Sequence, residues 1–428
     1  MKMIRVVHVN ESLKNNSVPN RIRIGGDGLG GDVSTKILTV HSEVDNDDVF
    51  EIKGSFIYKV FRKISSIISQ MEYKVSYCKE AGMPFSYYNV GIDISKEQIV
   101  QEADIIVLHW ICGSFISTRG LSKILGLNKP VVWVCHDNWP FTGGCHVRMG
   151  CEKFRDECGK CPQLQSNRRK DWSYRLLKAK KRAIRKGNIT VVSPSTWMDD
   201  HVAESSLLSG FNHYVIPNPI DTAKFVPIDR IKVRQKYNFD NDAVTILFGA
   251  VGATATPYKG YSYLLQALEL LEENLKDDIV INAVVFGASD GEKREGKRIA
   301  VKYLGYLSED QMVEAYNLAD VYVVPSLEDS FNSTVAEALS CTTPVVAFAT
   351  GGIKDIIDHQ ENGYLAKYKD AEDLARGIEW VLRENHNNML GINGRNKVEN
   401  TYQYSIVAKQ YAKVYRTICK DDVHKAIG

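Results

Sequence analysis

Short apolar runs rich in valine and isoleucine alternate along this chain with amphipathic segments. The runs cover residues 4–9, 105–108, 131–135, 190–193, 245–249, 279–286 and 321–325. Continuous apolar strands that are separated by helical segments are typical of parallel sheets whose two faces are both covered. The pattern therefore predicts the α/β class, with sheets of the doubly wound, Rossmann-like kind.

The break in this pattern lies at residues 215–220, where Pro217 and Pro219 interrupt it before a charged stretch. A chain of 428 residues also exceeds what a single hydrophobic core usually supports. We therefore expect two Rossmann-like domains that face each other across a cleft, because ligands of such sheets bind at the carboxyl ends of the strands. The expected parts are an N-terminal domain over residues 1–217, a C-terminal domain over 218–400, and a helical extension over 401–428 that packs back towards the N-terminal domain.

Composition and charge exclude several classes of protein. The 54 basic and 52 acidic residues leave a formal charge of +2, which argues against a nucleic-acid-binding protein. No apolar run approaches the roughly 18 residues that a membrane-spanning helix needs, and the N-terminus has the pattern of a strand instead of a signal peptide. We therefore expect a cytoplasmic protein whose nine cysteines stay reduced.

Two segments of the N-terminal half are basic. Residues 52–75 place apolar side chains on one face of a helix, with lysine and arginine interleaved. Residues 168–186 carry ten lysines or arginines and one aspartate. Two interpretations stay open for both segments: a helix of the fold with a solvated basic face, or a surface for anionic lipid that makes the protein peripheral on the inner face of a membrane.

The most informative stretch follows the expected strand at residues 321–325. A polar loop there ends at Asn332, Ser333 and Thr334, which can cap a helix that carries Glu337 about one turn in. The positive end of such a helix suits a diphosphate, and a glutamate in this position can accept two hydrogen bonds from a ribose diol. The simpler alternative is an ordinary strand, loop and helix with a capping glutamate.

Residues 243–415 resemble the retaining family 4 glycosyltransferases of the GT-B fold, whose signature is an acidic residue, seven intervening residues and a glutamate. Asp329 and Glu337 occupy these two positions. The resemblance implies that Glu337 binds the nucleotide ribose and Asp329 a donor-sugar hydroxyl. The family usually has glutamate at the first position, so Glu328 is a nearby substitute. The implied donor site consists of Gly252, Lys259, Gly287, Glu328, Asp329, Ser330, Phe331, Asn332, Ser333, Thr334 and Glu337.

A second match is the pair Lys259-Gly260, which resembles the family's Lys-Gly element after the first strand of the C-terminal domain. The resemblance implies that Lys259 neutralises the diphosphate leaving group, where charge accumulates as the glycosidic bond breaks. Taken in isolation, such a pair at a helix start is a surface turn. The loop over residues 249–256 lacks the arginine that the family often has, so backbone amides would contribute to phosphate binding.

The N-terminal half carries a histidine-rich stretch, residues 136–146, straight after the expected strand at 131–135. Together with His109-Trp110 it resembles a subgroup of the family that assembles bacterial surface polysaccharides such as capsule or O-antigen. A histidine at the carboxyl end of a strand is placed to contact the donor sugar or guide the acceptor, whereas a bond to a loop carbonyl is the structural alternative. The implied acceptor-side residues are His109, Trp110, His136, Asp137 and Asn138, and the implied catalytic residues are His136, Lys259, Asp329 and Glu337.

Four cysteines cluster in an insert over residues 143–165. They are Cys145, Cys151, Cys158 and Cys161, with a tight final pair. Four thiolates can close a tetrahedral zinc site, which would be structural because no position stays open for catalysis. Free thiols are the other interpretation, since the first two spacings are looser than in common zinc ribbons.

These observations predict a retaining hexosyltransferase that uses a UDP- or GDP-linked sugar and a polysaccharide or lipid-linked glycan acceptor. Positioning and charge stabilisation suffice for this chemistry, so we expect catalysis to require no cofactor. Two alternatives remain: a nucleotide-sugar epimerase, which would need more acid and base residues, and a non-catalytic partner subunit that binds nucleotide-sugar without turnover. Nucleic acid is not an expected partner.

Overall fold

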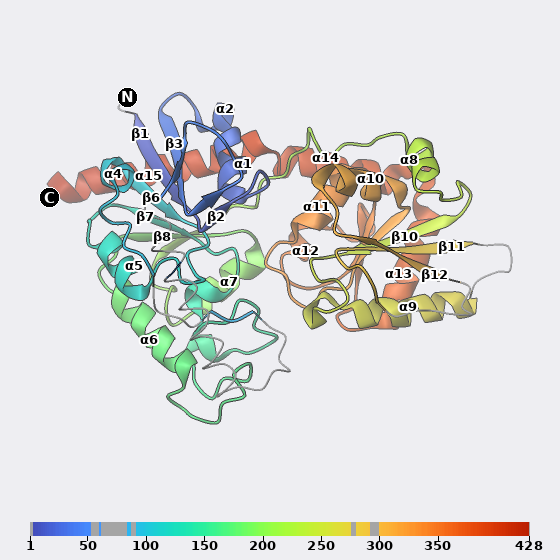
Figure 1. Cartoon of the computed structure of the whole chain (residues 1–428), viewed down its shortest axis with the longest axis horizontal. Helices are drawn as coiled ribbons and strands as arrows, with labels where there is room; N and C mark the ends of the chain where they lie inside the picture. The colour runs from blue at the N-terminus through green and yellow to red at the C-terminus, as the bar shows by residue number, and fades with distance from the viewer. Residues whose placement is uncertain are drawn as a thin grey trace. The chain divides into compact units, whose positions relative to one another are not determined.

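The computed structural model describes residues 3–52, 60, 84–86, 91–274, 280–291 and 299–427 (Figure 1). The chain divides into two compact units, the first comprising Met1–Pro219 with Tyr404–Gly428 and the second Ile220–Gln403. The predicted boundary at residues 217/218 lies two residues before this division, and the predicted extension from residue 401 begins three residues before the returning segment. The expected amphipathic helix at 52–75 falls outside the described residues, apart from residues 52 and 60.

The strands of the first unit form a seven-stranded parallel sheet in the order β5-β3-β1-β6-β7-β8-β9. Its members are β1 (Ile4–Val9), β3 (Val33–Thr39), β5 (Val49–Glu51), β6 (Ile105–Leu108), β7 (Val131–Val134), β8 (Ile189–Ser193) and β9 (Asn212–Val215). A separate short pair consists of β2 (Ser12–Leu13) and β4 (His41–Ser42). The central strands are continuous apolar runs because side chains on both faces are buried.

Helices cover both faces of this sheet. One face packs against α1 (Val18–Ile24), α2 (Gly26–Leu29) and α15 (Tyr404–Ile427), and the other against α4 (Gln98–Glu102), α5 (Thr118–Leu125), α6 (Trp172–Ile184) and α7 (Thr196–Glu204). The two-residue period of a strand separates the layers: Val6 and Val107 belong to the core under α15, whereas Val7 and Ile106 belong to the opposite core. Figure 1 shows α15 running beside α1 and α2.

The second unit contains a six-stranded parallel sheet in the order β12-β11-β10-β13-β14-β15. Its strands are β10 (Val244–Gly249), β11 (Ile281–Phe286), β12 (Ala300–Gly305), β13 (Val321–Val324), β14 (Val345–Phe348) and β15 (Gly363–Ala366). The order reverses direction at β10 and β13, the two central strands. A doubly wound sheet binds ligands beyond the carboxyl ends of its strands at such a point.

Helices again lie on both faces of the second sheet. The core on one face includes α8 (Arg230–Lys236), α10 (Glu309–Leu318), α11 (Ser333–Ser340) and α12 (Ile353–Ile356), and the other includes α9 (Tyr261–Asn274) and α13 (Ala371–Glu384). The helix α14 (Met389–Thr401) contributes Val398 to the first core and Leu390 to the second. Short 3-10 turns are η2 (Trp139–Phe141), η3 (Lys153–Arg155), η4 (Pro257–Lys259) and η5 (His386–Asn388).

Candidate functional site

The loop after β13 leads into α11 through a capped helix end. Asn332 has a left-handed backbone (φ 70°), and its side-chain oxygen accepts hydrogen bonds from the Val335 amide at 3.3 Å and the Thr334 hydroxyl at 2.7 Å. Asparagine tolerates this conformation better than most residues because its short polar side chain bonds locally. The predicted cap is therefore confirmed at Asn332, and the positive end of α11 lies at the carboxyl-terminal edge of the sheet.

Glu337 lies on α11 with its side chain nearly buried. The Tyr316 hydroxyl donates a hydrogen bond to Glu337 Oε2 at 3.3 Å. Burial, together with the nearby Glu337 charge, holds the pKa of Tyr316 well above its ordinary value, so this tyrosine stays a donor. A carboxylate held in this way has the oxygen atoms needed to accept hydrogen bonds from a diol.

Lys259 and Asp329 form an ion pair although seventy residues separate them in the sequence. Lys259 Nζ lies 3.1 Å and 3.0 Å from the two carboxylate oxygens of Asp329, and Asn332 Nδ2 donates to Asp329 Oδ2 at 2.9 Å. The Lys259 and Asp329 side chains are only 18% and 16% exposed. The structure therefore brings the two sequence motifs of the second unit into direct contact.

Backbone contacts hold the lysine loop against the end of β13. The Leu327 amide donates to the Tyr258 carbonyl at 2.7 Å. Gly260 has φ +75°, and a Cβ atom built on it would lie 1.9 Å from the Pro325 carbonyl oxygen. Only glycine fits both the conformation and this close approach. The glycine of the Lys-Gly pair is thus required by the packing that places Lys259 beside Asp329.

The two glycines predicted for the donor site meet beyond the ends of β10 and β11. The Gly252 amide donates to the Gly287 carbonyl at 3.0 Å, and both residues have positive φ angles, 64° and 79°. Gly351, which the sequence did not mark as a site residue, approaches the loop after β13 instead: its Cβ would lie 2.0 Å from the Asp329 carbonyl oxygen. The Gly352 amide donates to that oxygen at 3.0 Å. The glycine pair after β14 therefore supports the loop that carries Asp329.

The remaining predicted donor residues lie in the same loop but differ in environment. Phe331 is 1% exposed and packs edge-on against Tyr402 with ring centroids 5.4 Å apart. Its side chain belongs to the core, so only its backbone can serve a ligand. Glu328 is also nearly buried, whereas Ser330 and Ser333 are partly exposed.

In the first unit the predicted His109 and His136 are hydrogen-bonded to each other, with His109 Nδ1 2.8 Å from His136 Nε2. The other nitrogen of His109 lies 2.8 Å from Nδ1 of His8 on β1. His8 was not predicted as a site residue. The sequence signal for it was a histidine within the apolar run at residues 4–9, and the structure buries this side chain.

Asp137 and Asn138 are engaged within their own loop. Asp137 Oδ2 lies 2.7 Å from His146 Nδ1, and the Trp139 amide donates to Asp137 Oδ1 at 2.7 Å. Burial acts to raise the pKa of Asp137, but the His146 charge and these hydrogen bonds lower it below its ordinary value. Asn138 Nδ2 donates to the His146 carbonyl at 2.9 Å. Trp110 stacks on the His146 ring at 6.0 Å, so the acceptor-side set forms one packed cluster.

None of the four clustered cysteines forms a disulfide, and the neighbouring thiols act to raise the pKa of Cys145. Burial raises the pKa of Cys158 to about 12 and also raises the pKa values of Cys145 and Cys161. Among the residues that the structure describes, no three or more His, Cys, Asp or Glu side chains are arranged to hold a metal ion. A structural zinc site at Cys145, Cys151, Cys158 and Cys161 stays a prediction.

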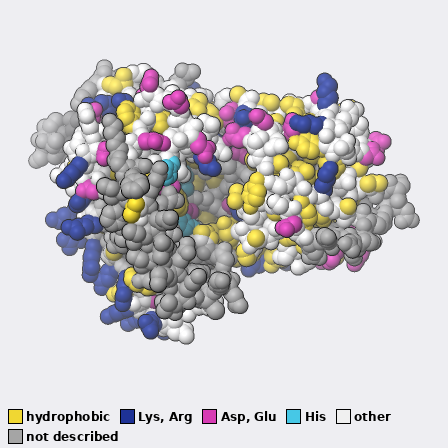
Figure 2. Space-filling view, viewed as in Figure 1, with side chains coloured by type: hydrophobic (Ala, Val, Ile, Leu, Met, Phe, Trp, Pro, Cys, Tyr) yellow, Lys and Arg dark blue, Asp and Glu magenta, His cyan; other side chains and the backbone are white. Residues whose placement is uncertain are grey.

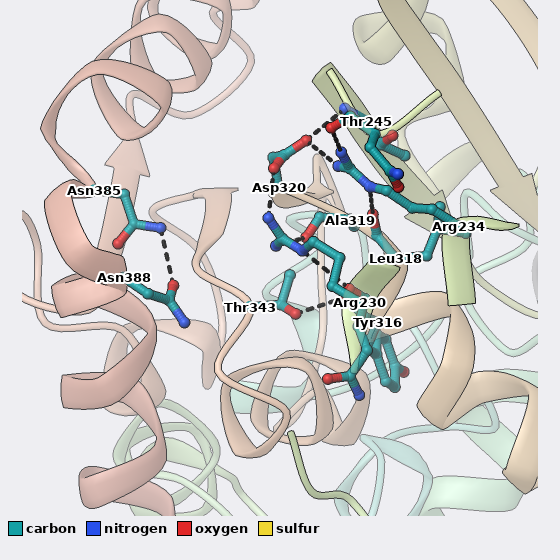
Figure 3. A network of polar contacts seen from close by, with 12 residues as sticks. Arg230, Arg234, Thr245, Tyr316, Leu318, Ala319, Asp320, Thr343, Asn385 and Asn388 are labelled. Atoms are coloured by element: carbon teal, nitrogen blue, oxygen red, sulfur yellow. Dashed lines mark hydrogen bonds and ion pairs between the residues drawn. The ribbon is translucent and has the colours of Figure 1, made fainter. Parts of the chain in front are cut away.

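A polar pocket of about 440 Å³ lies at the opposite, amino-terminal edge of the second sheet. Asp320 precedes β13 and accepts hydrogen bonds from Arg230 Nη1 and Arg234 Nη2, each at 2.7 Å, and from the Thr245 amide at 2.7 Å (Figure 3). Residues lining the pocket include Arg230, Asn317, Asp320, Thr343, Asn385 and Asn388. Since these arginines bond Asp320 and backbone carbonyls, the network fixes α8 to the sheet.

The basic segment at 168–186 contains α6 and presents most of its charge to solvent. The exposed members are Arg168, Arg169, Lys170, Arg175, Lys178, Lys181, Arg182, Arg185 and Lys186, whereas Lys180 is buried. Figure 2 shows lysine and arginine side chains gathered along the border of the first unit, where Figure 1 places α6. No helix in the described part of the chain is long and apolar enough to cross a membrane.

Comparison with known proteins finds a family match within the second unit. Residues 229–397 match the family model of the glycosyl transferases group 1. An uncharacterized glycosyltransferase of Methanocaldococcus jannaschii is 27% identical over 331 residues, 72% of this chain and 81% of that protein. A D-inositol 3-phosphate glycosyltransferase of Geodermatophilus obscurus is 33% identical over 183 residues, which span 39% of this chain and only 40% of that relative.

Among solved structures, HepE of Anabaena in complex with UDP-glucose superposes with a TM-score of 0.60 at 16% identity, covering 97% of this chain and all of that one. At this identity the likeness shows the fold alone. Residues 229–397 thus match the glycosyl transferases group 1 family model, and the fold of the chain is that of the GT-B glycosyltransferases.

Proposed function

We propose that this glycosyltransferase moves a hexosyl unit from a UDP- or GDP-linked sugar to a polysaccharide or lipid-linked glycan, with retention at the anomeric carbon. The observation that carries the proposal is the convergence of Lys259, Asp329 and the start of α11 at the carboxyl-terminal edge of the second sheet. A cation, a carboxylate and a positive helix end at one such edge suit a sugar bound through a diphosphate. The UDP-glucose complex of HepE, which shares the fold, agrees with this donor class.

Each residue has a distinct role in this proposal. Lys259 neutralises charge on the departing diphosphate, Asp329 accepts a hydrogen bond from a donor-sugar hydroxyl, and Glu337 accepts from the ribose diol. Lys259 is paired with Asp329 in the structure, so donor binding brings a diphosphate to a lysine that is already held in place. Preorganisation of this kind lowers the cost of charge stabilisation in the transition state.

The proposed reaction takes place on one face of the sugar. The bond between the anomeric carbon and the diphosphate oxygen breaks, and the acceptor hydroxyl oxygen forms its bond from the same side while its proton passes to the departing phosphate. No protein nucleophile is needed, because positioning and stabilisation of the diphosphate supply the catalysis. His136 of the first unit is proposed to contact the donor sugar or guide the acceptor.

A lipid-linked acceptor fits the exposed basic charge around α6. Anionic headgroups attract clustered lysines and arginines within a screening length of the surface, so this face would bring the enzyme to its acceptor at the inner face of a membrane. The acceptor class itself rests on the resemblance of residues 136–146 to enzymes of bacterial surface-polysaccharide assembly.

The test of the donor site is a thermal-shift panel of UDP, GDP, ADP and their sugar conjugates, with transfer measured for any that bind. One nucleotide and its conjugates should stabilise the wild type by about 2.7 kcal/mol at a hundred times the dissociation constant, and Glu337→Gln should weaken this. Lys259→Met should lower kcat by about a hundredfold or more, since it removes one charge from the leaving-group site.

Lys236→Met is the matched control, because Lys236 also forms a carboxylate ion pair in the second unit, with Glu314 at 2.7 Å. It should leave both nucleotide binding and transfer unchanged. Absence of any nucleotide shift in folded wild type, or full activity in Lys259→Met, would contradict the proposal. Binding without transfer or hydrolysis would instead favour the partner-subunit alternative, and an epimerised nucleotide-sugar would favour the epimerase.

A further inference from the structure

Three histidine side chains form one continuous hydrogen-bonded chain across β1, β6 and β7 of the first unit. His8 Nδ1 lies 2.8 Å from His109 Nε2, and His109 Nδ1 lies 2.8 Å from His136 Nε2. Successive rings are stacked with centroids 5.1 Å apart in both pairs. His8 and His109 are buried and His136 is partly exposed, so the chain runs from the core under α15 to the carboxyl-terminal edge of the sheet.

The three rings must share one tautomer. Burial lowers the pKa of His8 to about 3 and that of His136 to about 4, and it holds the pKa of His109 well below its ordinary value, so all three are neutral near pH 7. A neutral imidazole has one N–H donor and one acceptor nitrogen. Because His109 uses both nitrogens, either every ring carries its proton on Nδ1 or every ring carries it on Nε2.

The buried end of the chain favours the Nδ1–H arrangement. Tyr415 Oη of α15 lies 3.4 Å from His8 Nε2. Burial holds the pKa of Tyr415 well above its ordinary value, so the hydroxyl keeps its proton. With the histidine protons on Nδ1, this hydroxyl donates to His8. In the opposite arrangement its own proton would need another acceptor, and the described residues provide none; a buried donor without a partner is unfavourable.

The other end of the chain favours the same arrangement. Asp137 follows His136 directly, and its negative charge acts to raise the pKa of His136, which means that it stabilises positive charge there. The carboxylate is fixed by His146 and by the Trp139 amide. With every proton on Nδ1, all three N–H dipoles point along the chain from His8 towards His136, and their positive end is at the histidine whose positive charge Asp137 stabilises.

We propose that His8 and His109 are positioning residues, anchored by the Tyr415 hydroxyl, that hold His136 in the Nδ1–H tautomer. Any hydrogen bond that His136 makes through Nδ1 is then a donated one, suited to a sugar hydroxyl oxygen or to an oxygen that gains negative charge during the reaction. The structural part stands on the histidine contacts, whereas the role in the reaction rests on the proposed glycosyl transfer.

Nuclear magnetic resonance of the full chain labelled with ¹⁵N-histidine tests the structural part directly, because long-range couplings distinguish the two tautomers. In the wild type we expect the Nδ1–H form at all three positions. Tyr415→Phe removes only the hydroxyl and should introduce the Nε2–H form at His8 and His136 together. An Nε2–H form at His136 in the wild type, or unchanged tautomers in Tyr415→Phe, would overturn the proposal.

Tyr411→Phe is the matched control, since Tyr411 is also a buried tyrosine of α15 and lies one turn before Tyr415, with ring centroids 6.0 Å apart. It should leave all tautomers unchanged. His8→Phe provides an independent test. It removes the hydrogen bond between His8 and His109, so His109 and His136 should no longer be confined to the Nδ1–H tautomer. Retention of the Nδ1–H form at both positions in a folded His8→Phe protein would contradict the proposal that His8 and His109 set the tautomer of His136.

Kinetics test the role in the reaction. Tyr415→Phe should lower kcat by about tenfold, the scale of one lost hydrogen bond, while nucleotide stabilisation of the protein stays as in wild type. Tyr411→Phe should change neither quantity. Mixed tautomers with unchanged kcat would overturn the positioning role. If no transfer occurs with any donor, the proposed function fails. The tautomer measurement still shows whether His8 and His109 hold His136 in the Nδ1–H form.

Discussion

Lys180 is the buried exception in an otherwise exposed basic helix. Its ammonium donates to the carbonyl oxygens of Trp139 and Thr142 and lies 3.4 Å from the centroid of the Trp139 ring. Burial lowers the pKa of Lys180 to about 7, more than the nearby carboxylate and thiol groups raise it. In the unfolded chain its pKa should return to about 10.4. Folding therefore disfavours protonation of this side chain.

This shift predicts a pH dependence of stability. Between about pH 7 and 10 the unfolded chain binds one more proton at Lys180 than the folded protein, so the free energy of unfolding should rise with pH by up to about 1.4 kcal/mol per unit. Below pH 7 both states are protonated and this contribution is constant at its lowest value. Lys180→Met should remove that slope. Urea unfolding at several pH values between 7 and 9 measures it.

The slope is the decisive quantity, because Lys180→Met also removes hydrogen bonds to two carbonyl groups and can change stability at every pH. Lys178→Met is the control, since Lys178 lies on the same helix but is exposed. It should keep the wild-type slope. Parallel pH dependences for wild type and Lys180→Met would show that the lysine stays protonated in the folded protein.

Single residues were predictable where local chemistry identifies them. The Asn332 cap and the position of Glu337 on the following helix come from short-range patterns, which the structure reproduces. The contact between Lys259 and Asp329 could only be inferred through the family resemblance, because it depends on the order of the strands. His8 was missed for the same reason: nothing near it in sequence indicates that β6 will place His109 beside it.

At the scale of elements, Gly260 fixes the connection between η4 and α9 against the end of β13, and an alanine substitution tests this role. Gly260→Ala should destabilise the second unit by more than about 1–2 kcal/mol, because it combines an unfavourable left-handed backbone with a clash against the Pro325 carbonyl. It should also weaken nucleotide binding, since Lys259 is the preceding residue. Urea unfolding and the nucleotide thermal shift measure the two effects.

Gly305→Ala separates the cost of the left-handed backbone from the cost of the steric clash. Gly305 has φ +72°, close to the +75° of Gly260, but a Cβ atom there meets nothing within 4 Å. This variant should show only the backbone cost, about 1 kcal/mol, and should bind nucleotide normally. Equal losses in the two alanine variants would mean that contact with the end of β13 does not hold the lysine loop.

The strands that were predicted are those whose side chains are mostly buried. All seven apolar runs are strands, with ends within about two residues of the prediction. Several strands at or near the sheet edges were missed: β9 and β12 contain no buried residue, and β3 includes Ser34, Thr35 and Lys36. The short strand β14 was missed although all four of its residues are buried. A half-exposed strand lacks the continuous apolar run that identifies a buried one, and its pairing is set by the fold.

At the scale of the whole molecule, basic and acidic residues are nearly equal in number, but the basic residues are concentrated in one segment. The formal charge is only +2, yet nine exposed lysines and arginines lie between residues 168 and 186. Net charge alone therefore predicts weak attraction to an anionic surface, whereas a local cluster predicts an oriented attraction through this segment. The two expectations differ for variants that alter charge at different positions.

Binding to vesicles that contain phosphatidylglycerol distinguishes attraction through the net charge from attraction through the local basic cluster. Wild type should cosediment with such vesicles at low ionic strength and be released at about 1 M salt, where the screening length falls to about 3 Å. The triple variant Lys178→Glu, Lys181→Glu and Arg185→Glu should lose binding by about 1 kcal/mol or more per residue. Vesicles of neutral phosphatidylcholine should bind neither protein.

A second triple variant, Lys232→Glu, Lys367→Glu and Arg383→Glu, changes the net charge by the same amount through exposed residues of the second unit. It should retain vesicle binding, because the attraction depends on the charge near α6 and not on the total. Equal loss in both variants would leave net charge as the explanation, and undiminished binding of the α6 variant would exclude this basic face as the lipid contact. Retention of nucleotide stabilisation in both variants ensures that the comparison concerns folded proteins with an intact second unit.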